Sequence, residues 1–192
     1  MVHKIRRAMG RRDSRYTLEG MIEFDEGYFT VEANKIEKSH GTRGRGSSGK
    51  NNVAIMAEST QLEDINTGDT SKQCRYFKAK VLDNHEKEQV NKVIQESIEE
   101  KSIVFTDRSS SYVDIADFVE LHITEKSDQQ TTRETLKWVH ITISNAKRTL
   151  LGNYHRIKRK YLQLYLDEFV YKLNRRYFTD RLFDRLIIAC IC

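Results

Sequence analysis

The sequence has no proline, only three cysteines and no long hydrophobic run in its 192 residues. The cysteines (Cys74, Cys190 and Cys192) show no Cys-x-x-Cys spacing and have no clustered histidines beside them, which argues against a zinc site or a disulfide framework. No stretch approaches the roughly 20 apolar residues that a membrane helix needs, and the basic N-terminus lacks the apolar core of a signal peptide. We therefore expect a cytoplasmic protein without a membrane partner.

The composition that remains is that of a globular protein. Hydrophobic residues make up 38% and charged residues 32% of the chain, so one domain of ordinary size can bury a core and carry peripheral helices. The formal net charge of +5 favours a polyanionic partner, because surface cations attract phosphates and release counterions.

Residues 21–29, Met-Ile-Glu-Phe-Asp-Glu-Gly-Tyr-Phe, alternate apolar and acidic side chains in the manner of a β-strand. An ionised carboxylate on a buried strand is costly unless it is paired or bound to a metal, so Asp25 is the first candidate for a functional acid. The alternation places Glu23 on the face of Asp25 and Glu26 on the other face. The alternative, which the local pattern by itself favours, is an edge strand whose acids face water.

Residues 32–50 end in a glycine-rich, basic stretch that predicts a flexible cationic loop, with Arg43, Arg45 and Lys50 as candidate DNA contacts. The segment 44–50 also fits the Gly-x-x-x-x-Gly-Lys part of a phosphate-binding loop. That motif needs Ser or Thr next and a helix after it, whereas Asn51 follows and a strand pattern comes next, so a nucleoside triphosphate site is not favoured.

The rest of the chain predicts two further strands, which complete an antiparallel meander, and then a helix, a strand, a helix and a strand. The short run at 102–106 is β-branched and aromatic, so we expect a buried central strand that delivers Asp107 at its C-terminal end, where open α/β sheets place their chemistry. The expected elements are a basic helix at 1–12, strands at 52–58, 74–82, 102–106 and 119–124, helices at 86–101, 109–118, 131–151 and 158–175, and an apolar tail at 183–191 that we expect to be packed.

Asp25 and Asp107, on separate strands and with a polar group on a following helix, are the parts of a two-metal phosphoryl-transfer site. Magnesium is a hard ion that prefers oxygen ligands. Ligands from separate elements allow two ions about 3.5–4 Å apart to flank a phosphate.

In these residues the chain resembles the insertion-sequence transposases that carry a ribonuclease-H-like DDE domain. The resembling subgroup reads Val-Glu-Val-Asp-Glu-x-Tyr, a basic Gly-rich loop, Tyr-Thr-Asp, Gly-x-Tyr-His, and Tyr-Leu-Asp-Glu-Phe with a later Asn-Arg-Arg. The corresponding segments here are, in order, 22–28, 44–46, 105–107, 152–155, 165–169 and 174–176. No single segment is specific, but the ordered set is.

The resemblance implies an α/β fold with a ribonuclease-H-like mixed sheet, flanking helices and additional C-terminal helices. It also implies metal-dependent cleavage and strand transfer of transposon DNA, with two divalent ions (Mg²⁺ or Mn²⁺) bound by Asp25 and Asp107. Counting back from Gly152, the family's third ligand, a glutamate, falls at His140. Asn145 is the fallback for this position, and Glu134 is a weaker third option.

Lys147 follows His140 by seven residues, a family spacing that amounts to two helical turns, and would contact a DNA phosphate near the cut. His140 could instead be a structural histidine satisfied beside Trp138, and Lys147 could be a solvated helix lysine. An imidazole also suits manganese or zinc better than magnesium. Further expected DNA contacts are His155, Arg156, Lys158, Arg159, Arg175 and Arg176; the last two, together with Asn174, could instead cap a helix or pair with Asp167, Glu168 and Asp180.

The resemblance implies three parts: residues 1–19 as a basic helix left from an N-terminal DNA-binding region, 20–156 as the catalytic domain, and 157–192 as a C-terminal helical extension. Active relatives work as homodimers or larger assemblies on paired DNA ends. The chain has no Cys/His cluster in place of the zinc-binding region that relatives usually carry. Two other functions therefore stay open: a truncated, non-catalytic DNA-binding remnant, and a nuclease of the same fold.

Overall fold

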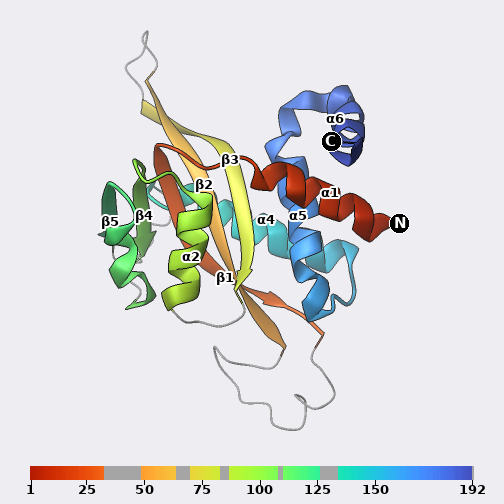
Figure 1. Cartoon of the computed structure of the whole chain (residues 1–192), viewed down its shortest axis with the longest axis horizontal. Coiled ribbons are helices and arrows are strands. Elements are labelled where there is room, and N and C mark those ends of the chain that lie inside the picture. Colours follow the sequence, from red (N-terminus) through yellow and green to blue (C-terminus); the bar gives the residue numbers. More distant parts are fainter. Residues whose placement is uncertain (33–48, 64–69, 83–86, 108–109, 126–133, 192) are drawn as a thin grey trace.

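A five-stranded sheet forms the centre of the molecule, with the strand order β3-β2-β1-β4-β5 (Figure 1). The computed structural model describes residues 1–32, 49–63, 70–82, 87–107, 110–125 and 134–191. β1, β2 and β3 pair antiparallel, whereas β4 is parallel to both of its neighbours, β1 and β5. The strands are β1 (Met21–Thr30), β2 (Lys50–Glu63), β3 (Thr70–Leu82), β4 (Ile103–Asp107) and β5 (Leu121–Glu125). This mixed sheet with flanking helices confirms the expected α/β, ribonuclease-H-like class.

The helices follow the predicted order along the chain. They are α1 (Val2–Ser14), α2 (Lys87–Ser97), η2 (Ser110–Asp117), α4 (Lys137–Asn153), η3 (Arg159–Tyr161), α5 (Leu162–Asn174), η4 (Arg176–Arg181) and α6 (Leu182–Ile191). The helix expected after Asp107 is a 3₁₀ helix, η2. Most of the expected loop at 32–50, including Arg43 and Arg45, lies outside the described residues. No helix in the described part of the chain is both long and apolar enough to cross a membrane.

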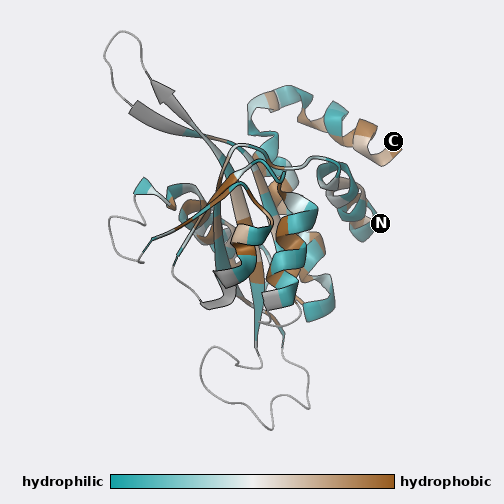
Figure 2. Cartoon of the chain, turned by 60° about the vertical axis from the view of Figure 1, so that its left-hand side comes forward, coloured by the Kyte–Doolittle hydropathy of each residue, from teal (hydrophilic) through white to brown (hydrophobic). Residues whose placement is uncertain are grey.

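Helices cover both faces of the sheet because its central strands are apolar on both sides. On β2, Val53, Ile55 and Ala57 pack with residues of α4 and α5, whereas Ala54 and Met56 pack with residues of α2 and η2. All five are fully buried. In Figure 2 the hydrophobic colour is concentrated on strands of the sheet and on parts of the helices. This layering places α4 directly on the face that carries Asp25.

The edge strand β3 is closed by two amide side chains of α5. Asn174 accepts a hydrogen bond from the Phe77 amide at 2.8 Å and donates one to the Phe77 carbonyl at 3.0 Å. Gln163 accepts from the Val81 amide at 2.8 Å and donates to the Ala79 carbonyl at 2.9 Å. The two side chains thus satisfy backbone groups that an exposed edge would leave open to another strand.

The N-terminal helix α1 lies across α5 and is tied to it by a buried arginine. Arg6 is only 6% exposed; its Nε donates to Glu168 at 2.7 Å and its Nη2 to the Tyr154 hydroxyl at 3.0 Å. The guanidinium also lies over the Tyr165 ring, 3.9 Å from its centroid. Two of the signature segments, 152–155 and 165–169, therefore meet around a residue of α1.

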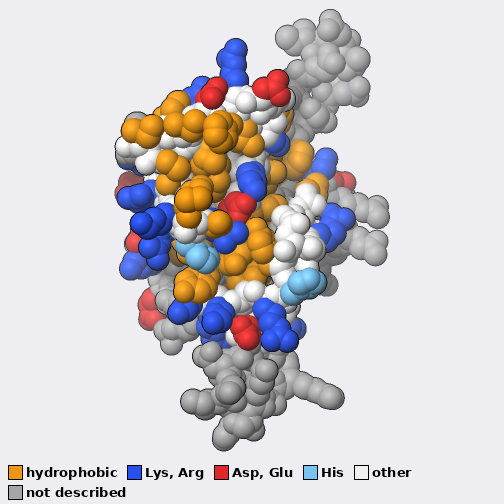
Figure 3. Space-filling view, turned by 90° about the vertical axis from the view of Figure 1, so that its right-hand side faces the viewer, with side chains coloured by type: hydrophobic (Ala, Val, Ile, Leu, Met, Phe, Trp, Pro, Cys, Tyr) orange, Lys and Arg blue, Asp and Glu red, His pale blue; other side chains and the backbone are white. Residues whose placement is uncertain are grey.

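The apolar tail forms α6, and only one side of it is packed. Ala189 is buried beside Met9 of α1, but Phe183 and Ile191 are 67% and 79% exposed. Hydrophobic side chains gather at the top of Figure 3, on the side of the molecule where α6 lies. The expectation that this tail is packed is thus wrong for the outer face of the helix.

Candidate active site

The strand register brings Asp25 and Asp107 together. β1 and β4 run parallel, with Glu23 opposite Phe105. Two residues further along each strand, Asp25 and Asp107 therefore lie at the same level and on the same face of neighbouring strands, which are about 4.8 Å apart in a sheet. The expected pairing of these two aspartates follows directly from this register.

Asp25 lies in a poorly compensated environment. Its side chain is 15% exposed, and its Oδ1 accepts a hydrogen bond from the Glu26 amide at 2.7 Å. Burial, and then the charge of Asp107, raise the pKa of Asp25 to about 7, although the Glu26 amide and Lys147 act in the opposite direction. Asp107 Oδ1 is buried and has no hydrogen-bond partner among the described residues. The two carboxylates therefore repel one another, and the charge of Lys147 offsets this repulsion only in part.

Helix α4 adds a nitrogen donor beside this pair. His140 Nδ1 is 3.7 Å from Asp25 Oδ2, and its side chain is 32% exposed. Burial lowers the pKa of His140, against the opposite effect of Asp107, and so favours the neutral imidazole. The neutral form is the one that can bind a metal ion.

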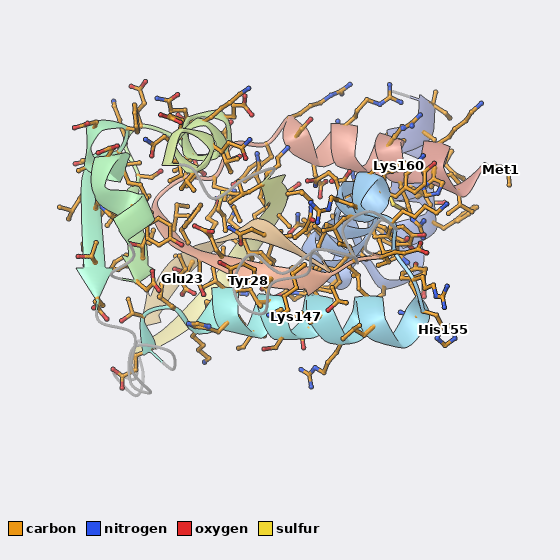
Figure 4. The ribbon with its side chains drawn as sticks, turned by 90° about the horizontal axis from the view of Figure 1, so that it is seen from below. Met1, Glu23, Tyr28, Lys147, His155 and Lys160 are labelled. Carbon is orange, nitrogen blue, oxygen red and sulfur yellow. The ribbon has the colours of Figure 1, made fainter. Side chains whose placement is uncertain are left out.

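Lys147 lies further along the same helix and faces β1 (Figure 4). Its Nζ is 5.8 Å from the centroid of the Phe29 ring, and its charge acts on the Asp25 carboxylate. The side chain is half-buried. A half-buried ammonium whose charge reaches Asp25 is suited to meet a phosphate that approaches this carboxylate.

Glu23 of β1 fixes the start of α4 on the face of the sheet that this helix covers. Its Oε2 accepts hydrogen bonds from the backbone amides of Trp138 at 2.6 Å and Val139 at 3.1 Å. The helix has no side-chain cap from its own N-cap residue, Leu136. A buried carboxylate at this end also complements the positive end of the helix dipole. Glu23 therefore sets where α4 begins relative to β1, and sequence reasoning gave it only a place on the face of Asp25.

The donor set fits a divalent ion in kind but is not closed around one. Asp25 and Asp107 supply carboxylate oxygens, one of them buried without a partner in the described part of the chain, and His140 supplies a neutral nitrogen. No group of three or more His, Cys, Asp or Glu side chains among the described residues is arranged to hold a metal ion. The site thus offers two acidic ligands and one adjacent imidazole.

A family model, the ISXO2-like transposase domain, matches residues 17–174. The chain belongs to this family. The match begins before β1 and ends with α5, so it includes Asp25, Asp107, His140 and Lys147. It confirms the relationship to insertion-sequence DDE transposases, and with it a transposase-type protein that acts on DNA. No match is found among curated proteins.

The other candidates for the third ligand of the ISXO2-like domain are Asn145 and Glu134. Asn145 accepts a hydrogen bond through Oδ1 from Arg148 at 2.7 Å, and Glu134 is exposed ahead of α4. The choice of His140 remains a prediction, supported by its distance to Asp25.

Sequence reasoning missed a third carboxylate at this edge of the sheet. Asp107 lies opposite Glu125 of the parallel strand β5, so the two share a level and a face. Glu125 accepts a hydrogen bond from the Thr135 hydroxyl at 2.7 Å. The last strand was expected to end at residue 124, whereas β5 ends at Glu125. A strand pattern extended by one residue and paired in parallel with the strand before Asp107 would have indicated Glu125.

Several predicted DNA contacts of the transposase domain surround the C-terminal half of α4. A cleft of about 310 Å³ extends from Lys147 to His155 and Arg156, with Tyr28 on its β1 side. His155 and Arg156 are exposed, as are Lys50, Lys158 and Arg159. These five side chains are accessible to a DNA backbone, and their role as contacts remains a prediction.

Arg175 and Arg176 make contacts within the fold. Arg175 Nη1 donates to Asp13 at 2.7 Å, and Arg176 Nη2 donates to the Cys74 carbonyl at 2.7 Å. The expected alternative partners were Asp167, Glu168 and Asp180, whereas Arg175 pairs with Asp13. These contacts give the Asn-Arg-Arg signature a clear structural role.

Proposed function

We propose that this protein is a DNA transposase that carries out metal-dependent strand cleavage and strand transfer of an insertion element. The observation that carries the proposal is the juxtaposition of Asp25 and Asp107 under α4 in a chain of a transposase family. Their shared level, partial burial and mutual charge are properties expected of carboxylates that receive a cation.

In this proposal Asp25, Asp107 and His140 hold divalent ions, and the ions supply a water of lowered pKa and positive charge at the scissile phosphate. Asp25 and Asp107 anchor the reaction to the rigid sheet. His140 contributes a neutral nitrogen, which favours Mn²⁺ relative to an all-carboxylate site. Lys147 neutralises a non-bridging phosphate oxygen, and α4 holds both of these side chains in one orientation.

The test is nicking of a supercoiled plasmid with Mg²⁺ or Mn²⁺. Wild type should nick, and Asp25→Asn or Asp107→Asn should abolish it, whereas the exposed Asp117→Asn should behave as wild type. DNA binding without nicking by the wild type would overturn the catalytic proposal and favour the non-catalytic remnant. Replacement of His140 by Glu should retain activity and shift the metal preference towards Mg²⁺.

Strand transfer separates a transposase from a nuclease of the same fold. DNA carrying the element's own ends should be joined to a target plasmid by wild type, through attack of the freed 3′-hydroxyl. Cleavage without joined products would favour the nuclease. Assembly as a homodimer or larger complex on paired ends, and the division into segments 1–19, 20–156 and 157–192, belong to the same proposal; light scattering with and without end DNA tests the first.

A further inference from the structure

A second charged region lies on the other side of α5 from the candidate active site. Lys4, Arg7 and Arg11 follow one another on α1 at helical spacing and line one wall of a cleft of about 610 Å³. The buried residues of the same helix, among them Arg6 and Met9, face α5 and α6. The three cations therefore form a stripe that the packing of α1 directs into the cleft.

The opposite wall is formed by β3 and α5. Lys80 of β3 lines the cleft together with Gln163 and Asp167 of α5. Asp167 accepts a hydrogen bond from Gln163 at 2.8 Å. The lining thus carries four cations, Lys4, Arg7, Arg11 and Lys80, against the single carboxylate of Asp167.

A buried lysine lies at the base of this region. Lys78 is two residues before Lys80, on the same face of β3, and is 5% exposed in a small hollow that shares Lys80 and Asp167 with the cleft. No salt bridge to Lys78 is present within the described residues, and the nearby Asp13 is paired with Arg175. Burial, followed by the charge of Lys80, lowers the pKa of Lys78 to about 8. An anion in the cleft would relieve this accumulation of positive charge.

We propose that the cleft between α1, β3 and α5 is a phosphate-binding site that holds the backbone of duplex DNA. The stripe from Lys4 to Arg11 extends for roughly 10 Å along the helix axis, longer than one phosphate group, so a polynucleotide fits it better than a free phosphate. None of the lining residues belongs to the candidate active site. The choice of DNA as the polyanion rests on the proposed function, whereas the site itself rests on the charges of the cleft.

The test measures how duplex affinity depends on salt, by fluorescence anisotropy of the full chain in EDTA. The slope of log K against log salt is negative, and each lost phosphate contact should reduce its magnitude by about 0.9. Arg7→Gln and Lys80→Gln should each do so and weaken binding several-fold at low salt. Arg12→Gln, an exposed change on the same helix but outside this cleft, should leave the slope unchanged. Thermal unfolding of all three variants confirms that they are folded.

Equal slopes for Arg7→Gln, Lys80→Gln and Arg12→Gln would overturn the cleft as a DNA site. Competition by inorganic phosphate at millimolar concentration, with no slope change, would show a small-anion site and would overturn the DNA assignment as well. Plasmid nicking is measured separately. If the slopes are unchanged and the wild type nicks DNA with metal, the cleft is rejected and the proposed function is kept. If the slopes become shallower and the wild type does not nick, the cleft is kept and the proposed function is rejected.

Discussion

Two carboxylates, the buried Asp13 and the partly buried Asp25, occupy opposite electrostatic situations. Asp13 accepts hydrogen bonds from Arg175 at 2.7 Å and from Asn174 at 3.1 Å, so its charge is compensated inside the fold. Asp25 has a second acid, Asp107, on the next strand and a pKa raised to about 7. A folded chain can hold the second arrangement when a ligand supplies the missing charge. The difference separates a carboxylate that builds the structure from one that is available for chemistry.

The largest expected effect on stability is at Asp13. Arg175→Ala removes its partner and the contact with the Tyr171 ring, leaving a buried, uncompensated charge. We expect a loss of about 3–5 kcal/mol in the free energy of unfolding by urea. The exposed Arg181→Ala is the control and should change little. A double variant with Asp13→Ala should recover part of the loss, and equal costs for the single and double variants would show that the charge of Asp13 is not the cause.

The opposite behaviour is expected at Asp25 and Asp107. A divalent ion at one hundred times its Kd should stabilise the wild type by about 2.7 kcal/mol, because it binds the folded chain. Asp107→Asn should abolish this gain, measured as a shift in Tm on adding Mn²⁺, while Asp117→Asn should keep it. A wild type whose Tm does not respond to Mn²⁺ would remove the contrast between the two carboxylates.

The comparison extends to a cation at Lys78. Its folded-state pKa of about 8 lies below the ordinary 10.5, so its contribution to stability is present above pH 10.5 and is lost as the pH falls through 8. Lys78→Met should therefore stabilise the fold by about 2 kcal/mol at pH 7, with the gain shrinking towards pH 10. Urea unfolding at both pH values measures this, with the exposed Lys101→Met as control. An equal gain at both pH values would indicate better packing instead of lost charge.

Sequence reasoning predicted the parts of the molecule that depend on alternation and order. The meander, the central strand at 102–106 and the meeting of Asp25 with Asp107 all follow from strand periodicity and from the place of each aspartate on its strand. The third-ligand position at His140 came from counting along a resemblance. Its 3.7 Å distance to Asp25 depends on how α4 rests on the sheet, which periodicity does not give.

Contacts between distant segments could not be predicted. The expected partners of Arg175 were acids within eight residues of it in the sequence, because a local sequence pattern identifies only nearby residues. Its actual partner, Asp13, is 162 residues away. The outer face of α6 illustrates the same limit: an apolar run predicts burial, but whether a neighbour exists to cover Phe183 depends on the tertiary arrangement.

Glu23 combines features of both carboxylates: it is fully buried, and the two backbone hydrogen bonds that its Oε2 accepts support the site by fixing α4. Glu23→Gln keeps an acceptor but loses the charge, so we expect a loss of about 1 kcal/mol in unfolding free energy. If displacement of α4 raises the activation barrier by a similar energy, the nicking rate should fall roughly fivefold. Glu23→Ala should reduce both the unfolding free energy and the nicking rate further. Amide hydrogen exchange at Trp138 and Val139 separates positioning from general destabilisation, because these two amides should lose protection before the rest of α4. If both stay protected in Glu23→Ala while nicking falls, Glu23 acts on the site by another route than the start of the helix.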